Sequence, residues 1–410
     1  MNNIYIFTRK TILAILLLVN INAYSHTITG KVLDERYFPV PNISIAITGG
    51  GSASTGNDGK FTISTDDWTY DLLLYDLSAN IGVLYKGLSV KNPELIFFGL
   101  VASKNINTEF VKVEFPPLPS GRSVILKFLA EDVFSCEDVF ASAGERTKVV
   151  NINFPSYMTR LNGRLIYLEK TPTAYLRYLE YPMTIIKEGY PQTVVFDSLS
   201  YGRTPGTSSV TIYPPAFAYD MKGFSVYADF LSQHRNAELT LNVTEGDIVS
   251  SKIIVPQNLP FGYRLKIEGR GGLKNGGSFV NSTYSYPGAT YNIATETAPK
   301  LDAPQDKYWG VSNNTMFSWD WGSGTGIYVV HFRAFMPVGD FYVVTREREL
   351  KNPKDIARSI LDGNEYSWQV SKYLTYTSVD DYVKPRLFAN DLGYKAVLTS
   401  EQRTFRINPF

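Results

Sequence analysis

The sequence predicts an all-β protein made of tandem β-sandwich domains, and three observations lead to this fold class. The chain of 410 residues is rich in tyrosine (28) and phenylalanine (24), which favour strands, and only 19% of its residues are charged. Its 31 glycines and 22 prolines interrupt the sequence at short intervals. Apolar residues alternate with polar ones over short runs, without a sustained pattern of helical period. Short strands separated by turns in this way are typical of β-sandwiches.

Residues 1–25 have the pattern of a cleaved signal peptide. Arg9 and Lys10 provide a positive end, residues 11–19 form a short apolar core, and Ala23-Tyr24-Ser25 places small residues before the expected cleavage site. The apolar core is shorter than the roughly 20 residues that a membrane-spanning helix needs. We therefore expect an exported protein that is cleaved after Ser25 and has no transmembrane segment afterwards.

Charge and cysteine content narrow the function classes. With 40 basic and 39 acidic residues, the chain has a formal net charge of +1, so we expect no nucleic-acid partner. Cys136 is the single cysteine, so it cannot form an internal disulfide, and no cysteine stands at the cleavage point for lipid attachment. A nucleophilic Cys136 would need a histidine and an acid beside it, and nothing in its sequence neighbourhood supports that pairing.

The clearest motif lies between Ile28 and Ile63. Residues 28, 30 and 32 form one run of period two, and residues 43, 45 and 47 form a second. The corner Pro39-Val40-Pro41-Asn42 joins the two runs, and Asn57-Asp58-Gly59 makes a tight turn into a third, Phe61-Thr62-Ile63. This pattern predicts three strands at the start of the mature chain.

This run resembles the carboxypeptidase regulatory-like domain, a transthyretin-like β-sandwich common in secreted and cell-surface proteins. The resemblance rests on three segments: Gly30-Lys31-Val32-Leu33-Asp34, Pro39-Val40-Pro41-Asn42-Ile43-Ser44-Ile45 and Thr55-Gly56-Asn57-Asp58-Gly59-Lys60-Phe61. The sequence departs from the family at Phe38, where a glycine usually precedes the proline. The resemblance implies an accessory domain without chemistry of its own. We assign it residues 26–117, with a last strand at Glu109–Phe115.

Proline clusters divide the remaining chain. Pro116-Pro117-Leu118-Pro119 is a stiff spacer that cannot join a central strand, so the first domain is expected to end there. Residues 118–297 contain short strands separated by turns, which fit either one sandwich or two. We find no family resemblance in this middle region, and an enzyme with an unrecognised site there stays an alternative.

Residues 298–410 resemble a fibronectin type III domain, which is an immunoglobulin-like sandwich. The run Met316–Trp321 is similar to its second strand with a buried tryptophan, and Leu361–Val370 to its sixth strand with a tyrosine corner. The resemblance implies that the Tyr366 hydroxyl group bonds back to the backbone just upstream. A short helix starting at Asn352 and Pro353 is expected as an insertion.

We find no catalytic motif. A metallocarboxypeptidase zinc site needs a His-x-x-Glu pair and a second histidine, and neither His26, His234 nor His331 has that spacing. The glycine-rich run Gly269–Ser278 lacks the Gly-Lys-Ser/Thr ending of a phosphate loop and is expected to be a flexible loop. Four adjacent acidic pairs are interpreted as solvated loop residues: Asp66-Asp67, Glu131-Asp132, Glu137-Asp138 and Asp380-Asp381. We therefore expect no enzyme activity, metal or cofactor.

Tryptophans are the remaining candidates, because sugars stack on flat exposed aromatic rings. Phe317, Trp319 and Trp321 recur at every second position and so share one face, which for Phe317 and Trp319 we interpret as a core face. Trp68 and Trp309 have polar neighbours in the sequence and are the candidate binding residues.

The leading hypothesis is a non-catalytic, exported binding or scaffolding module of the bacterial cell envelope. It would lie in the periplasm, on the outer-membrane surface or outside the cell, with an envelope protein or a glycan as its partner. The first-domain motif behind a signal peptide is similar to many proteins of Bacteroidetes-type bacteria. A carbohydrate-binding accessory protein of a glycan-degradation system is the alternative, since sandwiches of these two families often accompany such enzymes.

Overall fold

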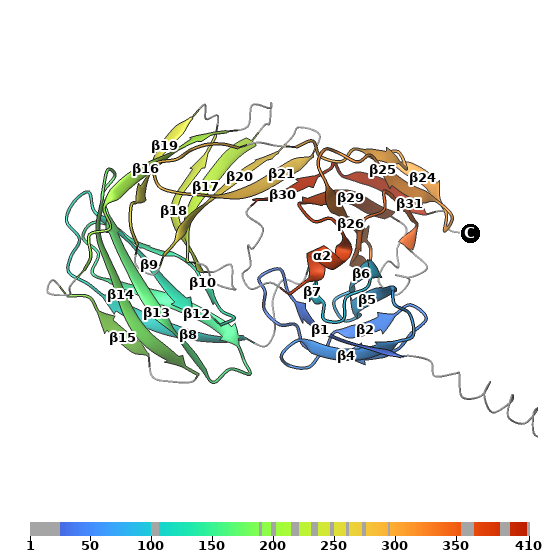
Figure 1. The fold of residues 1–410 in the computed structure, drawn as a ribbon, viewed down its shortest axis with the longest axis horizontal. Helices are drawn as coiled ribbons and strands as arrows, with labels where there is room; N and C mark the ends of the chain where they lie inside the picture. Colours follow the sequence, from blue (N-terminus) through green and yellow to red (C-terminus); the bar gives the residue numbers. More distant parts are fainter. Residues whose placement is uncertain are drawn as a thin grey trace, which may run out of the picture.

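The computed structural model describes residues 25–99, 106–130, 132–187, 191–197, 202–214, 221–230, 237–246, 250–259, 262–272, 276–293, 296–353, 365–385 and 394–407. In these residues nearly all regular structure is β-strand, which confirms the predicted all-β fold class (Figure 1). The expected signal peptide before Ser25 and most of the helix expected from Asn352 lie outside the described residues.

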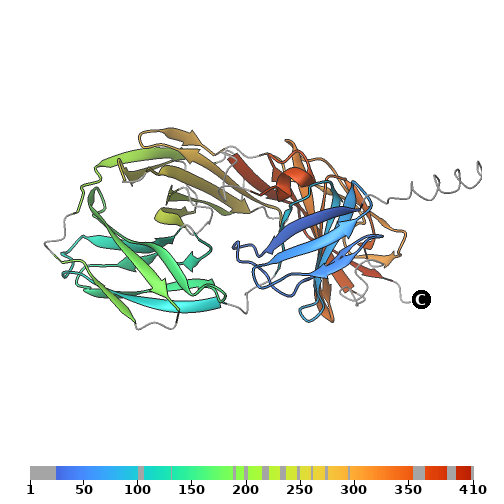
Figure 2. The same cartoon turned by 60° about the horizontal axis from the view of Figure 1, so that its bottom comes forward.

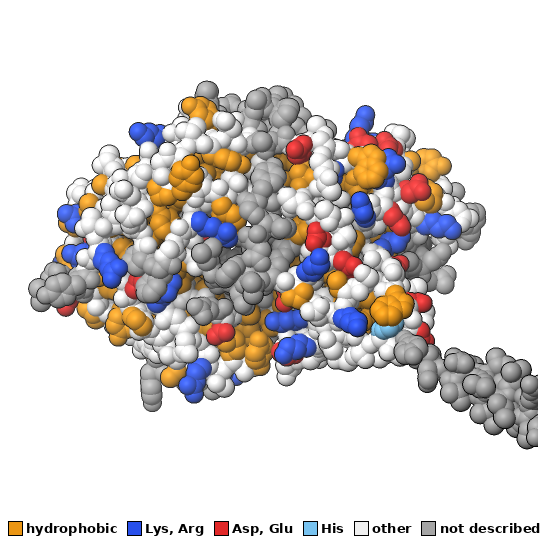
Figure 3. Space-filling model, viewed as in Figure 1, with side chains coloured by type: hydrophobic (Ala, Val, Ile, Leu, Met, Phe, Trp, Pro, Cys, Tyr) orange, Lys and Arg blue, Asp and Glu red, His pale blue; other side chains and the backbone are white. Residues whose placement is uncertain are grey.

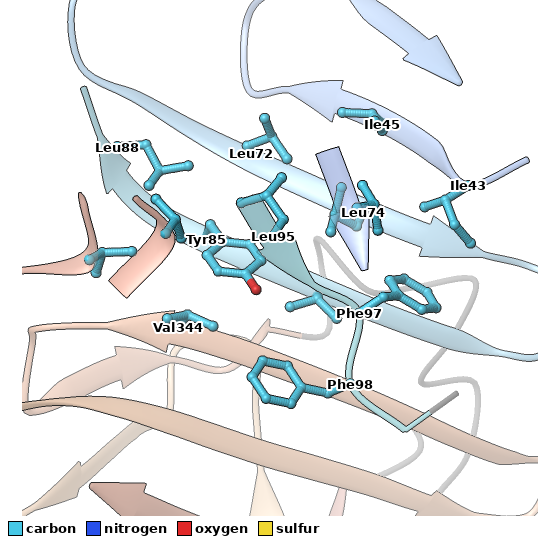
Figure 4. Close-up of a cluster of buried hydrophobic side chains, with 14 of the residues drawn as sticks. Ile43, Ile45, Leu72, Leu74, Tyr85, Leu88, Leu95, Phe97, Phe98 and Val344 are labelled. Carbon is cyan, nitrogen blue, oxygen red and sulfur yellow. The ribbon is translucent and has the colours of Figure 1, made fainter. Parts of the chain in front are cut away.

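The first unit is a sandwich formed by the sheet β4-β1-β7 and the strands β2, β3, β5 and β6. Its strands are β1 (His26–Leu33), β2 (Ser44–Ile47), β3 (Ser52–Ser54), β4 (Lys60–Thr65), β5 (Tyr70–Asp76), β6 (Ile81–Leu88) and β7 (Glu94–Ile96). The apolar positions of period two predicted from the sequence lie in its core, and Figure 4 shows Ile43 and Ile45 there beside Leu72 and Leu74. Gly30 is required because a Cβ there would lie 2.4 Å from Cζ of Phe61 on the paired strand.

The second unit consists of two four-stranded sheets, β10-β12-β8-β15 and β11-β9-β13-β14. Its strands are β8 (Ile106–Glu114), β9 (Ser123–Ala130), β10 (Ser135–Cys136), β11 (Val139–Ala141), β12 (Thr147–Pro155), β13 (Arg160–Lys170), β14 (Tyr175–Ile186) and β15 (Gln192–Val195). Strand β8 corresponds to the strand that sequence analysis assigned to the first domain. It pairs instead with β12 and β15, because Val111 and Val113 pack into the core of the second unit.

The third unit is formed by the sheet β19-β16-β22 and by strands β17, β18, β20 and β21 of a larger sheet. Its strands are β16 (Thr207–Tyr213), β17 (Met221–Asp229), β18 (Glu238–Glu245), β19 (Ser251–Pro256), β20 (Arg264–Gly272), β21 (Ser278–Ser285) and β22 (Thr290–Asn292). The prediction of a flexible loop over Gly269–Ser278 is therefore wrong in its first part, because residues 269–272 form the end of strand β20. Glycine is needed there since a Cβ at Gly269 would lie 2.7 Å from the side chain of Ile293.

The last unit surrounds the tryptophan core that the sequence indicated. Its elements are β23 (Leu301–Ala303), β24 (Tyr308–Val311), β25 (Met316–Trp319), β26 (Gly326–Phe335), β27 (Val338–Thr345), β28 (Glu349–Lys351), β29 (Glu365–Leu374), α2 (Val379–Val383), β30 (Tyr394–Thr399) and β31 (Arg403–Ile407). Phe317, Trp319 and Trp368 are buried together, so the expected core role of Phe317 and Trp319 is confirmed. Tyr366 is also buried and stacks on Phe405 at 5.1 Å between ring centroids. The upstream partner expected for its hydroxyl group lies outside the described residues.

A single 14-stranded sheet connects the first, third and last units. Strand β30 pairs with both β21 and β29, and β27 pairs in parallel with β6 of the first unit. Ile327 and Val344 of the last unit consequently lie in the core of the first unit. In Figures 1 and 2 the first and second units form the two ends of an arch that the other strands bridge.

Strand β9 explains how the second and third units are held together. Its sequence is a nearly continuous apolar run, and residues 124–130 are all buried. Val124, Leu126 and Phe128 face the core of the second unit, while Ile125 and Leu129 face that of the third. The sheet that contains β9 is therefore covered on both faces, which is the environment that such a run predicts. The middle region thus contains two cores, one of the two arrangements left open by the sequence.

Candidate binding surfaces

The cysteine and the described histidines that sequence analysis considered for catalysis have defined surroundings. Burial raises the pKa of the Cys136 thiol to about 11, so it stays protonated and unreactive near neutral pH. Within the described ranges, no group of three or more His, Cys, Asp or Glu side chains could hold a metal ion. His26 lies with its ring centroid 3.8 Å from that of Trp68, and His234 lies outside the described residues.

His331 forms a pair with a carboxylate. Its Nε2 atom lies 2.7 Å from Oδ1 of Asp340, and its ring stacks on Tyr342 with 4.2 Å between centroids and 2° between planes. A histidine paired with an aspartate can activate a nucleophile by accepting its proton. The contacts described for this imidazole, however, are those with Asp340 and Tyr342, and neither is such a nucleophile. We interpret the pair as a cross-strand contact that fixes β26 against β27.

The acidic pairs differ from the interpretation as solvated residues in two places. Asp138 lies beside the buried Lys127, with 3.2 Å between Oδ1 and Nζ, and its Oδ2 accepts the backbone N–H of Thr240 at 3.0 Å. It therefore joins the second unit to strand β18 of the third. Asp381 accepts hydrogen bonds from Thr377 at the start of α2. Asp66 and Asp67 are exposed as expected, and Glu131 lies outside the described residues.

Both candidate binding tryptophans are on the surface, as predicted. Trp68 is 70% exposed in the turn between β4 and β5, and Trp309 is 67% exposed on β24. They lie in different units and share no described contact, so the structure does not bring them into one site. Trp309 lies in a sheet beside the charged side chain of Arg406.

Trp309 belongs to a row of side chains on the open face of the C-terminal sheet. Trp309 on β24 is paired with Arg406 on β31, which is paired with Glu365 on β29. The register of β26 against β29 places Phe335 next to Glu365, and Phe335 is paired with Val338 on β27. Paired residues of neighbouring strands point to the same face, so these five residues, which we call the Trp309 row, lie side by side. With strands about 4.8 Å apart, the row is about 19 Å long.

In the Trp309 row a central pair of charged residues is flanked by apolar residues on both sides. The guanidinium carbon of Arg406 lies 4.5 Å from the centroid of the Trp309 ring, and its Nη2 lies 3.2 Å from Oε2 of Glu365. These contacts connect the indole ring to the central ion pair of the row. Phe335 is 40% exposed and Val338 54%, and the hairpin that joins them carries Met336, which is 85% exposed. Sequence analysis missed this hairpin, although two apolar residues flank its Met336-Pro337 turn.

Trp321 is a further exposed tryptophan that the sequence pattern did not identify. Strand β25 ends at Trp319, so the alternation that buries Trp319 does not continue, and Trp321 is 56% exposed. Asp320 marks this end, because its Oδ1 accepts the backbone N–H of Gly322 at 3.0 Å in a turn. The Asp-x-Gly sequence indicates a turn, and this signal could have predicted that the strand ends before Trp321. The guanidinium of Arg348 lies 4.4 Å from the centroid of the Trp321 ring.

A buried lysine fixes the loop that carries Trp321. Lys372 is 1% exposed, and its ammonium group donates to the carbonyl oxygens of Trp321 at 2.6 Å, Ser323 at 2.9 Å and Gly324. All three donors of the ammonium group are used, so the loop is held at three points. Burial lowers the pKa of Lys372 below its usual value.

A groove of about 660 Å³ is lined by Arg348, whose guanidinium group contacts the Trp321 ring, and we call it the Trp321 groove. It lies over the outer face of the sheet β23-β25-β28, with Arg348 shared between the groove and the Trp321 ring. An ion pair between Lys86 and Glu347 forms part of its wall. Its lining comprises Lys86, Asp302, Met316, Ser318, Trp319, Glu347, Arg348, Glu349, Leu350 and Lys351. The groove thus offers charged hydrogen-bonding groups of both signs, and its Arg348 connects it to the exposed Trp321 ring.

Comparisons with known proteins give similarities to solved structures only. No family model and no curated protein matches the sequence. One similar structure is the Bacillus anthracis TIE protein, at 10% identity and a TM-score of 0.17, over 66% of this chain and 50% of that one. A second is a 1.5-MDa bacterial ice-binding adhesin, at 10% identity and a TM-score of 0.18, over 74% of this chain and 98% of that one. A third is the Streptococcal ancillary pilin, at 12% identity and a TM-score of 0.16, over 66% of this chain and 93% of that one. The chain spans half the length of the TIE protein, and TM-scores this low carry no argument about function.

Proposed function

We propose that this chain is a non-catalytic, exported binding protein of the bacterial cell envelope, and that the Trp309 row is its binding face. The observation that supports this most directly is the exposure of Trp309, Phe335, Met336 and Val338 at one end of a single sheet. Phe335, Met336 and Val338 are neighbours on one hairpin, and Trp309 lies across the Arg406–Glu365 pair from them. Exposed apolar side chains that gather on one surface mark places that contact another molecule. Figure 3 shows apolar side chains and charged side chains of both signs over the face in view.

The shape of the row favours a large ligand over a small metabolite. It is a flat strip across five strands, whereas small molecules bind in concave pockets. Its central Arg406–Glu365 ion pair is exposed and adds little stability, but it can orient a polar ligand between the aromatic ends. The signal-peptide pattern and the resemblance to carboxypeptidase regulatory-like and fibronectin type III domains support export and a surface role. Within the described residues, no helix is both long and apolar enough to cross a membrane.

Carbohydrate binding is the second candidate function, and the Trp321 groove favours it. A sugar offers one apolar ring face and several hydroxyl groups, so it suits an exposed indole beside many hydrogen-bonding side chains. Arg348 connects the two, since it lines the groove and lies over the Trp321 ring.

Three matched variants of the mature chain test both functions. Trp309→Ala, Trp321→Ala and Trp68→Ala each remove one exposed indole and leave the cores intact. Binding would be measured on immobilised cell-envelope preparations and on a microarray of bacterial and plant glycans. We expect Trp309→Ala to weaken binding to the envelope at least about tenfold, as loss of a central aromatic contact does, and Trp68→Ala to leave it unchanged.

Loss of glycan binding in Trp321→Ala alone would assign the function to the groove instead. Binding that survives both Trp309→Ala and Trp321→Ala would contradict the proposal. Mass analysis of the secreted protein tests export: a mature terminus at His26 is expected, and a retained Met1 in the cytosol would exclude it.

A further inference from the structure

A second pocket lies between the second and third units, and its residues are distant in sequence from Trp309 and Trp321. Its volume is about 530 Å³, which is in the range of small-molecule sites. The ends of β9 and β13 form one wall, and strands β18 and β19 form the other; Figure 1 shows these strands at the same end of the arch. Its lining includes Arg122, Ser123, Lys170, Thr171, Asn242 and Lys252. We call it the Lys170 pocket.

The charged side chains that line the Lys170 pocket are all basic. Arg122, Lys170 and Lys252 come from three different strands or turns and converge on it. Among the described residues, Glu169 is the carboxylate that pairs with one of these cations; it is 5% exposed, and its Oε1 lies 2.8 Å from Nη1 of Arg122. Within the described part of the chain, three cations with this one paired carboxylate leave an excess of positive charge that attracts an anion.

The ammonium group of Lys170 has N–H donors that no described residue uses. Its Nζ donates to the carbonyl oxygen of Leu241 at 3.0 Å, and it lies 5.9 Å from the centroid of the Tyr175 ring. An ammonium group has three N–H donors, so two remain beyond this hydrogen bond. Among the described residues, no carboxylate lies within ion-pair distance of Lys170 or Lys252. Burial lowers the pKa of Lys170, and an anion bound beside it would offset that cost.

The remaining lining suits the body of a small organic ligand. Pro172, Ile253 and Ile254 are apolar, while Ser123, Thr171 and Asn242 can form hydrogen bonds. The site therefore combines an anion-attracting end with a mixed wall. We propose that the Lys170 pocket binds a small ligand that carries one oxyanion group, a carboxylate or a sulfate, on a body about the size of one or two sugar rings.

Isothermal titration calorimetry of the mature chain at low ionic strength tests this. The probes are D-glucuronate, inorganic sulfate and the uncharged methyl glucoside. We expect glucuronate to bind and the glucoside not to bind. Lys170→Met removes a partly buried cation and should weaken binding at least about tenfold, whereas Lys252→Gln removes an exposed one and should weaken it about two- to fivefold.

Control variants separate this site from the surfaces above. Lys60→Gln removes an exposed lysine in the first unit, and Trp309→Ala alters the proposed binding face; neither should change the affinity for glucuronate. Sulfate that binds as tightly as glucuronate would show recognition of the oxyanion alone, and weaker sulfate binding would show that the sugar body contributes. Equal binding of the uncharged glucoside, or affinity unchanged in both Lys252→Gln and a correctly folded Lys170→Met, would overturn the proposal.

Discussion

Trp319 and Trp321 are two residues apart, and substituting each by alanine should have different consequences for stability. Trp319 is 1% exposed and contacts Tyr328 edge to face with 5.6 Å between ring centroids. Trp319→Ala removes a large core side chain and leaves a cavity, which costs about 3–5 kcal/mol. Trp321 is 56% exposed, and its main described ring contact is with Arg348. Trp321→Ala should therefore cost only about 0.5–1 kcal/mol, the value of an exposed cation–π contact.

Urea denaturation of the mature chain, followed by far-ultraviolet circular dichroism, measures both free energies of unfolding. Because the chain has several cores, amide hydrogen exchange in β26 should be followed as well, since it reports on this core. A difference of at least about 2 kcal/mol between the two variants is expected. Equal losses would refute the reasoning, because they would place both tryptophans on the same face of one strand.

Three further predictions concern buried charges. Burial raises the pKa of Asp34 above its ordinary 3.8, so its contribution to stability is greatest below that pH and is lost as the pH rises through the folded-state pKa. The stability of the wild type relative to Asp34→Asn should fall as the pH rises above 3.8, and a difference that stays constant with pH would exclude this. Lys127→Met should lower the free energy of unfolding by about 3–5 kcal/mol because the buried Asp138 loses its ion-pair partner. The double variant Lys127→Met/Asp138→Asn should lose less stability in thermal denaturation than the sum of the two single variants, and additive losses would contradict this. Lys372→Met should lower the free energy of unfolding by at least about 2 kcal/mol and make residues 321–324 susceptible to proteolysis. An unchanged cleavage pattern would show that the loop keeps its conformation without Lys372.

The fold class and several core positions follow from local pattern. Residues 28 and 32, 43 to 47, and 61 and 63 alternate with period two, and a strand of that period must turn one face inward, so the burial of Ile28, Ile45 and Phe61 was predictable. Trp68 and Trp309 were recognised as surface residues because their sequence neighbours are polar. Trp321 was not, since period two holds only while the strand lasts, and this strand ends at Trp319.

Only the tertiary structure decided which strands meet. A strand can hydrogen-bond to any other, and its sequence does not state its partner, so the pairing of β8 with β12 and of β6 with β27 was not readable from the chain. The proposed sites depend on such pairings. The Trp309 row joins five strands between residues 309 and 406, and the Lys170 pocket joins residues 122 and 252. The sequence by itself determined the kind of strand and much of what it buries, because those properties are local. The neighbours of each strand, and therefore its binding surfaces, depend on contacts between distant residues that form only when the sheets assemble.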